Sequence, residues 1–261
     1  MNPLASLSAS ARQAAGLAET EHRPWPLPPG PWRVGMTLAD LLLVHWRVKT
    51  EELRRLVPPK LEVDTFDGSA WLGLLAFRVD ALRLRGTLPL PGLSSFPEAN
   101  VRTYVTAGGM PGIWFLSLDV GSRFAVEPAR RLYHLPYFHA RMSLRPRGDW
   151  IEVESVRAAT ADRPVVFSGR YRPRGPVFAA APGSLEHFLA ERYCLYAVDG
   201  RGRLGRAEIH HAAWPLQRAE VELGLNAMAP EGVRLPDEPP LAHFVAERGV
   251  LIWPLRRVEG L

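Results

Sequence analysis

Two stretches of the chain alternate between polar and apolar residues with a period of two. The first stretch, residues 100–107, has polar or aromatic even positions: Asn100, Arg102, Tyr104 and Thr106. The second stretch, residues 137–144, repeats the pattern on its odd positions: Tyr137, His139, Arg141 and Ser143. Alternate side chains of a strand point to opposite faces, so each stretch predicts a β-strand with one polar row. Either the two rows face each other inside a curved sheet and line a pocket, or both face water.

The remaining pattern predicts many short strands, with two or three short helices between them. Strands are expected at 41–48, 61–66, 69–78, 113–119, 150–157, 165–171, 194–198, 204–211, 221–225 and 250–253. Asp67-Gly68 is a strong hairpin signal, and Ser184 is expected to cap a helix. The expected fold class is therefore α+β, mainly antiparallel β, in one barrel-like domain. We expect a flexible N-terminal tail over residues 1–23 and a single domain over residues 24–261.

Composition and charge exclude several classes of protein. Of the 32 Lys and Arg residues only Lys49 and Lys60 are lysines, and the arginines are scattered along the chain, so nucleic-acid binding is not expected. No 18-residue apolar run is present, so no membrane span is expected. Residues 1–20 lack the apolar core of a secretory signal, and we expect a cytoplasmic protein. The single cysteine, Cys194, stands in an apolar run and is interpreted as a packed core thiol.

One segment near the start of the chain is rich in proline. Residues 22–32 read HRPWPLPPGPW, which favours an extended conformation. We interpret the segment as an arm laid over the domain and anchored by its two tryptophans, in preference to a docking motif for another protein.

A series of motifs carries a resemblance to a known family. They are HW at 45–46, LRRLVPPKLEVDTFDGSAWLG at 53–73, FPEANVRTYV at 96–105, GIWFLSLD at 112–119, ARRLYHLPY at 129–137, PGSLEHFLAERYCLY at 182–196 and HHAAWPLQRAEVE at 210–222. This series resembles the YqjF-like family of uncharacterised bacterial proteins, which is grouped with the acetoacetate decarboxylase-like superfamily. The resemblance implies a curved antiparallel sheet that closes into a cone or barrel around a small-molecule cavity, often with oligomerisation.

The resemblance also implies a change at the catalytic position of the superfamily. Its decarboxylases use a lysine that forms a Schiff base, and Tyr137 stands at the corresponding position here. Glu98, in Phe96-Pro97-Glu98-Ala99, looks like the counterpart of an acidic pocket residue. A phenol cannot form a Schiff base, which requires a primary amine. Amine-catalysed decarboxylation is therefore not expected.

Two classes of function remain open for the predicted pocket. The first is a binding protein for an organic acid or carbonyl metabolite, whose ligand-binding residues are Asn100, Arg102, Tyr104, His139 and Arg141. The second is an enzyme of enol or carbonyl chemistry, a lyase, hydratase or isomerase, with Glu98 as general base and Tyr137 as donor to an oxyanion. In either class Arg102 or Arg141 would hold a carboxylate. Alternatively, Glu98 and Tyr137 form a structural pair without turnover.

Metal and cofactor sites have little support in the sequence. His210 and His211 are adjacent, so on a strand they point to opposite faces. No metal-binding histidine spacing, dinucleotide motif, phosphate-binding loop or serine-hydrolase motif is present. We therefore expect no metal and no cofactor. His45, beside Trp46, is interpreted as a hydrogen-bonded core residue.

Overall fold

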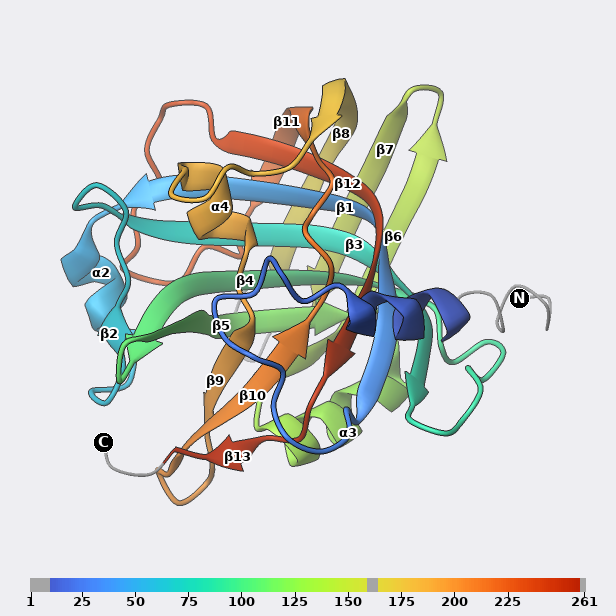
Figure 1. Cartoon of the computed structure of the whole chain (residues 1–261). Coiled ribbons are helices and arrows are strands. Elements are labelled where there is room, and N and C mark those ends of the chain that lie inside the picture. The colour runs from blue at the N-terminus through green and yellow to red at the C-terminus, as the bar shows by residue number, and fades with distance from the viewer. Residues whose placement is uncertain (1–9, 159–163, 259–261) are drawn as a thin grey trace.

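Most of the described chain is β-strand and forms one sheet (Figure 1). The structure, a computed structural model, describes residues 10–158 and 164–258. Its strands are β1 (Val34–Val48), β2 (Glu62–Val63), β3 (Ala70–Leu84), β4 (Phe96–Ala107), β5 (Met110–Val120), β6 (Tyr137–Arg147), β7 (Trp150–Arg157), β8 (Val165–Phe178), β9 (Cys194–Val198), β10 (Leu204–His210), β11 (Leu216–Asn226), β12 (Leu241–Ile252) and β13 (Arg256–Arg257). Its helices are η1 (Gly16–Ala18), α2 (Thr50–Arg54), α3 (Arg123–Tyr133) and α4 (Leu185–Ala190). Every strand expected from the sequence overlaps an observed strand.

The order of strands in the sheet brings the two alternating stretches close together. The order is β13-β10-β9-β5-β6-β7-β8-β11-β12-β1-β3-β4-β2, with additional pairings between β4 and β5 and between β10 and β12. The pairings are antiparallel, as expected, except that β5 runs parallel to both β6 and β9. Because β5 pairs with β4 on one edge and with β6 on the other, a single strand separates the Asn100 stretch from the Tyr137 stretch.

Two local signals of the sequence have the predicted effect. Phe66 and Ser69 exchange backbone hydrogen bonds around Asp67 and Gly68, both of which have positive φ, as a two-residue hairpin turn requires. Ser184 precedes α4, and its Oγ accepts a hydrogen bond from the backbone N–H of His187 at 3.2 Å. Such a bond satisfies one of the free N–H groups at a helix N-terminus.

The central strands β1, β3 and β4 are buried on both faces. One face of the sheet carries a large apolar cluster that includes Leu43, Leu75, Phe77, Leu118 and Val120. We call this side the Leu75 face. The opposite face carries a second cluster, which includes Leu42, Leu74, Val101, Phe167 and Phe244. Burial on both sides explains the nearly continuous apolar sequence of β3, since neither face of that strand meets water.

The N-terminal segment is packed against the sheet from residue 10 onward. Residues 10–15 are helical, and Gln13 is only 2% exposed. The Gln13 side chain donates to Thr37 Oγ1 at 3.2 Å and accepts from Arg83 Nε at 2.9 Å. We expected residues 1–23 to be a flexible tail, and the structure places Gln13 of this segment in buried hydrogen bonds with Thr37 and Arg83. Residues 1–9 lie outside the described part of the chain.

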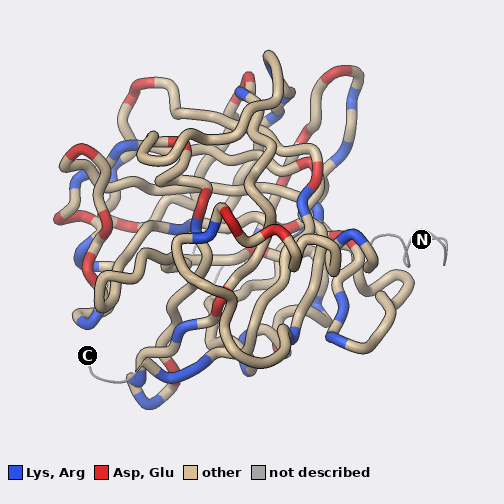
Figure 2. Tube along the Cα trace, in the orientation of Figure 1, with Lys and Arg blue, Asp and Glu red and all other residues tan. Residues whose placement is uncertain are grey.

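Basic and acidic residues are spread over the molecule. Figure 2 shows them interspersed along most of the chain, as expected from their scatter in the sequence. Within the described ranges, no helix is long and apolar enough to cross a membrane. Cys194 is fully buried, as expected of a packed thiol, and burial raises its pKa to about 12.

Candidate functional site

The polar row of β4 lies on the Leu75 face and is buried. Glu98, Asn100, Arg102 and Tyr104 are 7%, 3%, 8% and 0% exposed. Their cross-strand partners on β3 are Phe77 for Glu98 and Leu75 for Asn100, both members of the apolar cluster on this face. Directly opposite residues of neighbouring strands share a face of the sheet. The row therefore points into an apolar core, and the alternative in which it faces water does not apply to β4.

Tyr137 and His139 of β6 extend this row across the sheet. Leu118 of β5 pairs with Asn100 on one side and with Tyr137 on the other, and Val120 pairs in the same way with Glu98 and His139. Both β6 side chains are partly buried. Burial raises the pKa of Tyr137 well above its usual value. The nearby Glu98 carboxyl and Tyr133 phenol raise it further. Glu98 and Tyr137 are thus neighbours, although they lie on strands that are not adjacent.

Arg141 does not join the buried group. Its side chain is exposed, although it shares the alternation of Tyr137 and His139. The pairing of β6 with β5 ends at His139, and Arg141 pairs only with Val156 of β7. The structure therefore places Arg141, which we expected to bind the ligand, apart from the buried polar group, whereas the guanidinium of Arg102 is buried within it.

Two residues that the sequence did not assign to the site lie beside Arg102. His45 Nε2 is hydrogen-bonded to Tyr104 Oη at 2.7 Å, so the interpretation of His45 as a hydrogen-bonded core residue is confirmed. Gly73 lies opposite both His45 and Arg102 in the sheet. A Cβ at Gly73 would lie 3.1 Å from the His45 ring and 3.4 Å from Arg102 Cγ. The absence of a side chain there allows the imidazole and the guanidinium stem to approach each other.

His243 of β12 is a third unforeseen member of the group. It pairs with Leu43 of β1, a member of the Leu75 face, and it is 3% exposed. The pKa of His45 is lowered well below its usual value by burial, then by the charge of Arg102 and by the proximity of His243. Burial also lowers the pKa of His243. Both imidazoles are therefore neutral at pH 7, and no local motif marks His243 in the sequence.

Several polar atoms of this group lack a hydrogen-bond partner among the described residues. They are His45 Nδ1, Asn100 Oδ1, Arg102 Nε and His243 Nε2. Buried polar atoms in folded proteins are almost always hydrogen-bonded, to protein or to a bound molecule. Arg102 also has no ion-pair partner in the described part of the chain, since the salt bridges found there involve other residues. The group thus combines a buried cation with unpaired donors and acceptors.

The surroundings of Glu98 raise the pKa of its carboxyl group. Its pKa is about 8, mainly because burial raises it. The charge of Asp119 also raises this pKa, and the hydrogen bond from Asn100 Nδ2 to Glu98 Oε1 at 3.4 Å lowers it. At pH 7 most molecules therefore carry a protonated Glu98, which can donate a hydrogen bond. Arg102 therefore brings a positive charge to a group whose two buried histidines, His45 and His243, are neutral at pH 7.

One end of the polar row is covered by α4 and by the hairpin before β3. The Phe188 ring lies 5.4 Å from the Tyr104 ring and 5.6 Å from the Phe66 ring. Arg192 stands over Tyr104 at 4.9 Å and forms an ion pair with Asp64 at 2.6 Å. These contacts shield the hydrogen bond between Tyr104 and His45 from solvent.

Neither lysine belongs to the polar group around Arg102, and the described residues form no cluster suited to a metal ion. Lys49 and Lys60 are exposed and flank α2. Among the residues that the structure describes, no three His, Cys, Asp or Glu side chains are placed to hold a metal ion. A surface cleft of about 950 Å³ beside β5 and α3 is lined by none of the predicted site residues.

Comparison with solved structures gives the class of fold. The chain resembles an acetoacetate decarboxylase from Legionella pneumophila with a TM-score of 0.61 at 13% identity, over 93% of this chain and 95% of the other. It also resembles the enduracididine biosynthesis enzyme MppR, determined in complex with pyruvate, with a TM-score of 0.59 at 14% identity, over 91% and 94% of the two chains. The protein thus has the acetoacetate decarboxylase-like fold.

Sequence comparison gives the family. Residues 35–248 match the DUF2071 family, described as an uncharacterised conserved protein. The chain is 44% identical to the uncharacterised protein YqjF of Bacillus subtilis strain 168 over 232 residues, which cover 88% of this chain and 95% of that protein. The chain belongs to this family, as the resemblance of its motifs predicted.

Proposed function

We propose that the protein binds a small organic acid carrying a carbonyl or hydroxyl group on the Leu75 face of the sheet. The observation that carries the proposal is Arg102, a buried guanidinium without an ion-pair partner among the described residues. An unpaired buried charge is costly, so an anion that reaches it is bound favourably. Asn100 and His45 supply unpaired polar atoms beside it for the second oxygen of such a ligand.

The fold relatives are consistent with this ligand class. MppR, which shares the fold, has been determined with pyruvate bound. In our proposal the pairings of β4 with β5 and of β10 with β12 close the sheet around the Leu75 face, as in a cone. The apolar walls then exclude water from the ligand and strengthen its contact with Arg102.

The test is calorimetric titration with pyruvate and acetoacetate, beside pyruvamide as a neutral analogue. The proposal expects the two acids to bind and the amide to bind at least tenfold more weakly, because a charge-assisted hydrogen bond contributes about 1.5–3 kcal/mol. Equal affinity for pyruvate and pyruvamide would show that no cation selects the ligand. If neither acid gives a binding isotherm, the proposal is wrong.

A second candidate is an enzyme of enol or carbonyl chemistry that uses Glu98 and Tyr137. The observation in its favour is the pKa of Glu98, about 8, since a group that titrates near neutrality both accepts and donates protons. Exchange of the pyruvate methyl protons in D₂O, followed by NMR, separates the two functions. Exchange that disappears in Glu98→Gln while pyruvate still binds favours the enzyme, and binding without exchange favours the binding protein.

Amine catalysis is expected to be absent. Borohydride reduction in the presence of acetoacetate traps a Schiff base as a stable adduct on lysine. We expect no mass increase on this chain, because Lys49 and Lys60 are exposed at the two ends of the α2 region and lie outside the polar group around Arg102. A lysine-dependent decarboxylase treated in parallel is the positive control. An adduct on either lysine, located by peptide mass spectrometry, would contradict the expectation.

A further inference from the structure

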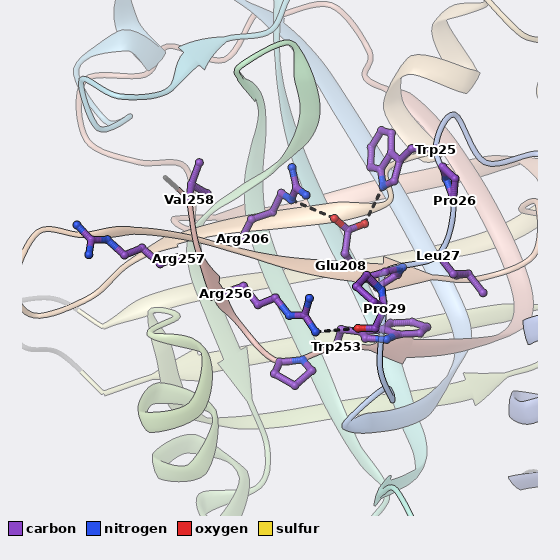
Figure 3. A pocket seen from close by; sticks show the side chains of 12 residues that line it. Trp25, Pro26, Leu27, Pro29, Arg206, Glu208, Trp253, Arg256, Arg257 and Val258 are labelled. Carbon is purple, nitrogen blue, oxygen red and sulfur yellow. Dashed lines mark hydrogen bonds and ion pairs between the residues drawn. The ribbon is translucent and has the colours of Figure 1, made fainter. Parts of the chain in front are cut away.

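A second pocket lies outside the Leu75 face, where the proline-rich arm meets the end of the chain (Figure 3). It has a volume of about 410 Å³ and is lined by residues 25–29, two residues of β10, residues 253–254 and residues 256–258. Three hydrogen bonds hold the arm there. Trp25 Nε1 donates to Glu208 Oε2 at 2.7 Å, Trp253 Nε1 donates to Gly30 O at 2.9 Å, and Arg256 Nη2 donates to Pro29 O at 2.7 Å.

The pocket places two arginines directly opposite each other. Arg206 of β10 and Arg256 of β13 are cross-strand partners, an arrangement that is destabilising for like charges. Arg206 forms an ion pair with Glu208 at 3.0 Å, but the same carboxylate also accepts from Arg23 at 3.3 Å. Arg256 is exposed and has no carboxylate partner among the described residues. Its charge is therefore not neutralised within the described protein.

A third arginine, Arg257, adds to the positive potential of the pocket. Arg257 also lines the pocket, so three arginines stand against one glutamate in its lining. Figure 2 shows basic segments close together near the C-terminal mark. A concave site with an excess of one charge concentrates ligands of the opposite charge.

The other walls of the pocket are apolar. Trp253 and Pro254 contribute to the lining, and Trp25, Pro26 and Leu27 come from the arm. Figure 3 labels Trp253 and these three arm residues. The volume is within the range of small-molecule sites, which combine apolar walls with a few polar groups. The proline-rich arm thus forms a wall of a pocket, in addition to covering the domain.

We propose that this pocket binds a small organic anion, with its carboxylate or phosphate on Arg256 and Arg206 and its apolar body against Trp253 and the arm. The anion neutralises the guanidinium of Arg256, which has no carboxylate partner among the described residues, and this is the physical reason for binding. This site shares no residue with the polar group around Arg102, so it does not depend on the function proposed for the Leu75 face.

The test is calorimetric titration of the full chain with benzoate, phenyl phosphate and inorganic phosphate. We expect binding of benzoate or phenyl phosphate, with the stronger of the two identifying the anionic group, and weaker binding of inorganic phosphate, which has no apolar body. Arg256→Gln is expected to weaken the organic probes about tenfold or more, because a charge-assisted hydrogen bond is lost. The matched control is Arg201→Gln, an exposed arginine of the neighbouring turn that does not line the pocket, and it should change the affinity less than twofold.

Three results would overturn this inference. Binding of neither organic probe to the wild type would show that the pocket takes no such anion. An equal loss in Arg256→Gln and Arg201→Gln would show that general positive charge, rather than the pocket, attracts the probe. Loss of probe binding in Arg102→Met with full binding in Arg256→Gln would assign the probe to the Leu75 face.

Discussion

Replacing Arg102 with methionine is expected to raise the Kd for pyruvate or acetoacetate by about 100-fold or more, while the unliganded protein stays folded and becomes no less stable. Removing one partner of a buried charge contact costs about 2–5 kcal/mol of binding free energy. In the unliganded protein the same guanidinium is buried without an ion-pair partner among the described residues, and its Nε is unpaired. A methionine of similar length removes that desolvation cost and fills most of the space.

The combination of lost binding and retained stability separates a functional from a structural role. A residue that only holds the fold lowers stability when it is replaced, whereas a binding residue is often destabilising without its ligand. Calorimetric titration gives the Kd, and scanning calorimetry gives the Tm of both proteins.

Arg141→Met is the matched control for this experiment. Arg141 is an exposed arginine on β6 that the alternation of the sequence assigned to the same site. We expect its replacement to leave the Kd within about twofold, since a solvated charge outside the site contributes little. If Arg141→Met weakened binding as much as Arg102→Met, or if Arg102→Met bound normally, the assignment of Arg102 as the carboxylate-binding residue would be lost.

Replacing Glu98 with glutamine is expected to change how the stability of the protein depends on pH. The pKa of Glu98 is about 8 in the folded protein because of burial, and its ordinary value is 4.5. Between these two values the folded state holds a proton that the unfolded state has released. The contribution of Glu98 to the free energy of unfolding is therefore largest below pH 4.5, falls as the pH rises, and is lost above pH 8.

The size of this effect follows from the same two values. Each unit of pKa difference corresponds to 1.36 kcal/mol, so ionising Glu98 in the folded state costs at most about 5 kcal/mol. Glutamine resembles the protonated carboxyl in shape and carries no charge, and its carbonyl oxygen can still accept from Asn100. We expect Glu98→Gln and wild type to have similar stability at pH 5, and the variant to be more stable by several kcal/mol at pH 9.

The measurement is urea unfolding of both proteins at several values between pH 5 and pH 9. The difference between the two proteins isolates Glu98, because the other titrating groups are common to both. Glu62→Gln on β2, an exposed position, is the control and should follow the wild type at every pH. A difference between Glu98→Gln and wild type that does not vary with pH would contradict the raised pKa of Glu98.

Local chemistry predicted much of the secondary structure. The turn at Asp67-Gly68 and the cap at Ser184 depend on a few adjacent residues, so they could be recognised without any knowledge of the fold. Alternation placed Asn100, Arg102 and Tyr104 on one face of a strand for a similar reason, since neighbouring side chains of a strand always point to opposite sides. The motifs from His45 to Glu222 were sufficient to predict the family.

Only the tertiary structure decided which residues belong to the buried polar group around Arg102. The sequence by itself determined which side chains share a face of β4 and of β6, because that depends only on the geometry of one strand. Only the fold decided that this face is buried, that Tyr137 lies beside Glu98, and that Arg141 lies beyond the end of the pairing with β5. His45 and His243 reach the group from β1 and β12, since pairing between strands distant in sequence brings them there. Those pairings depend on how the whole sheet packs, and no local pattern encodes them.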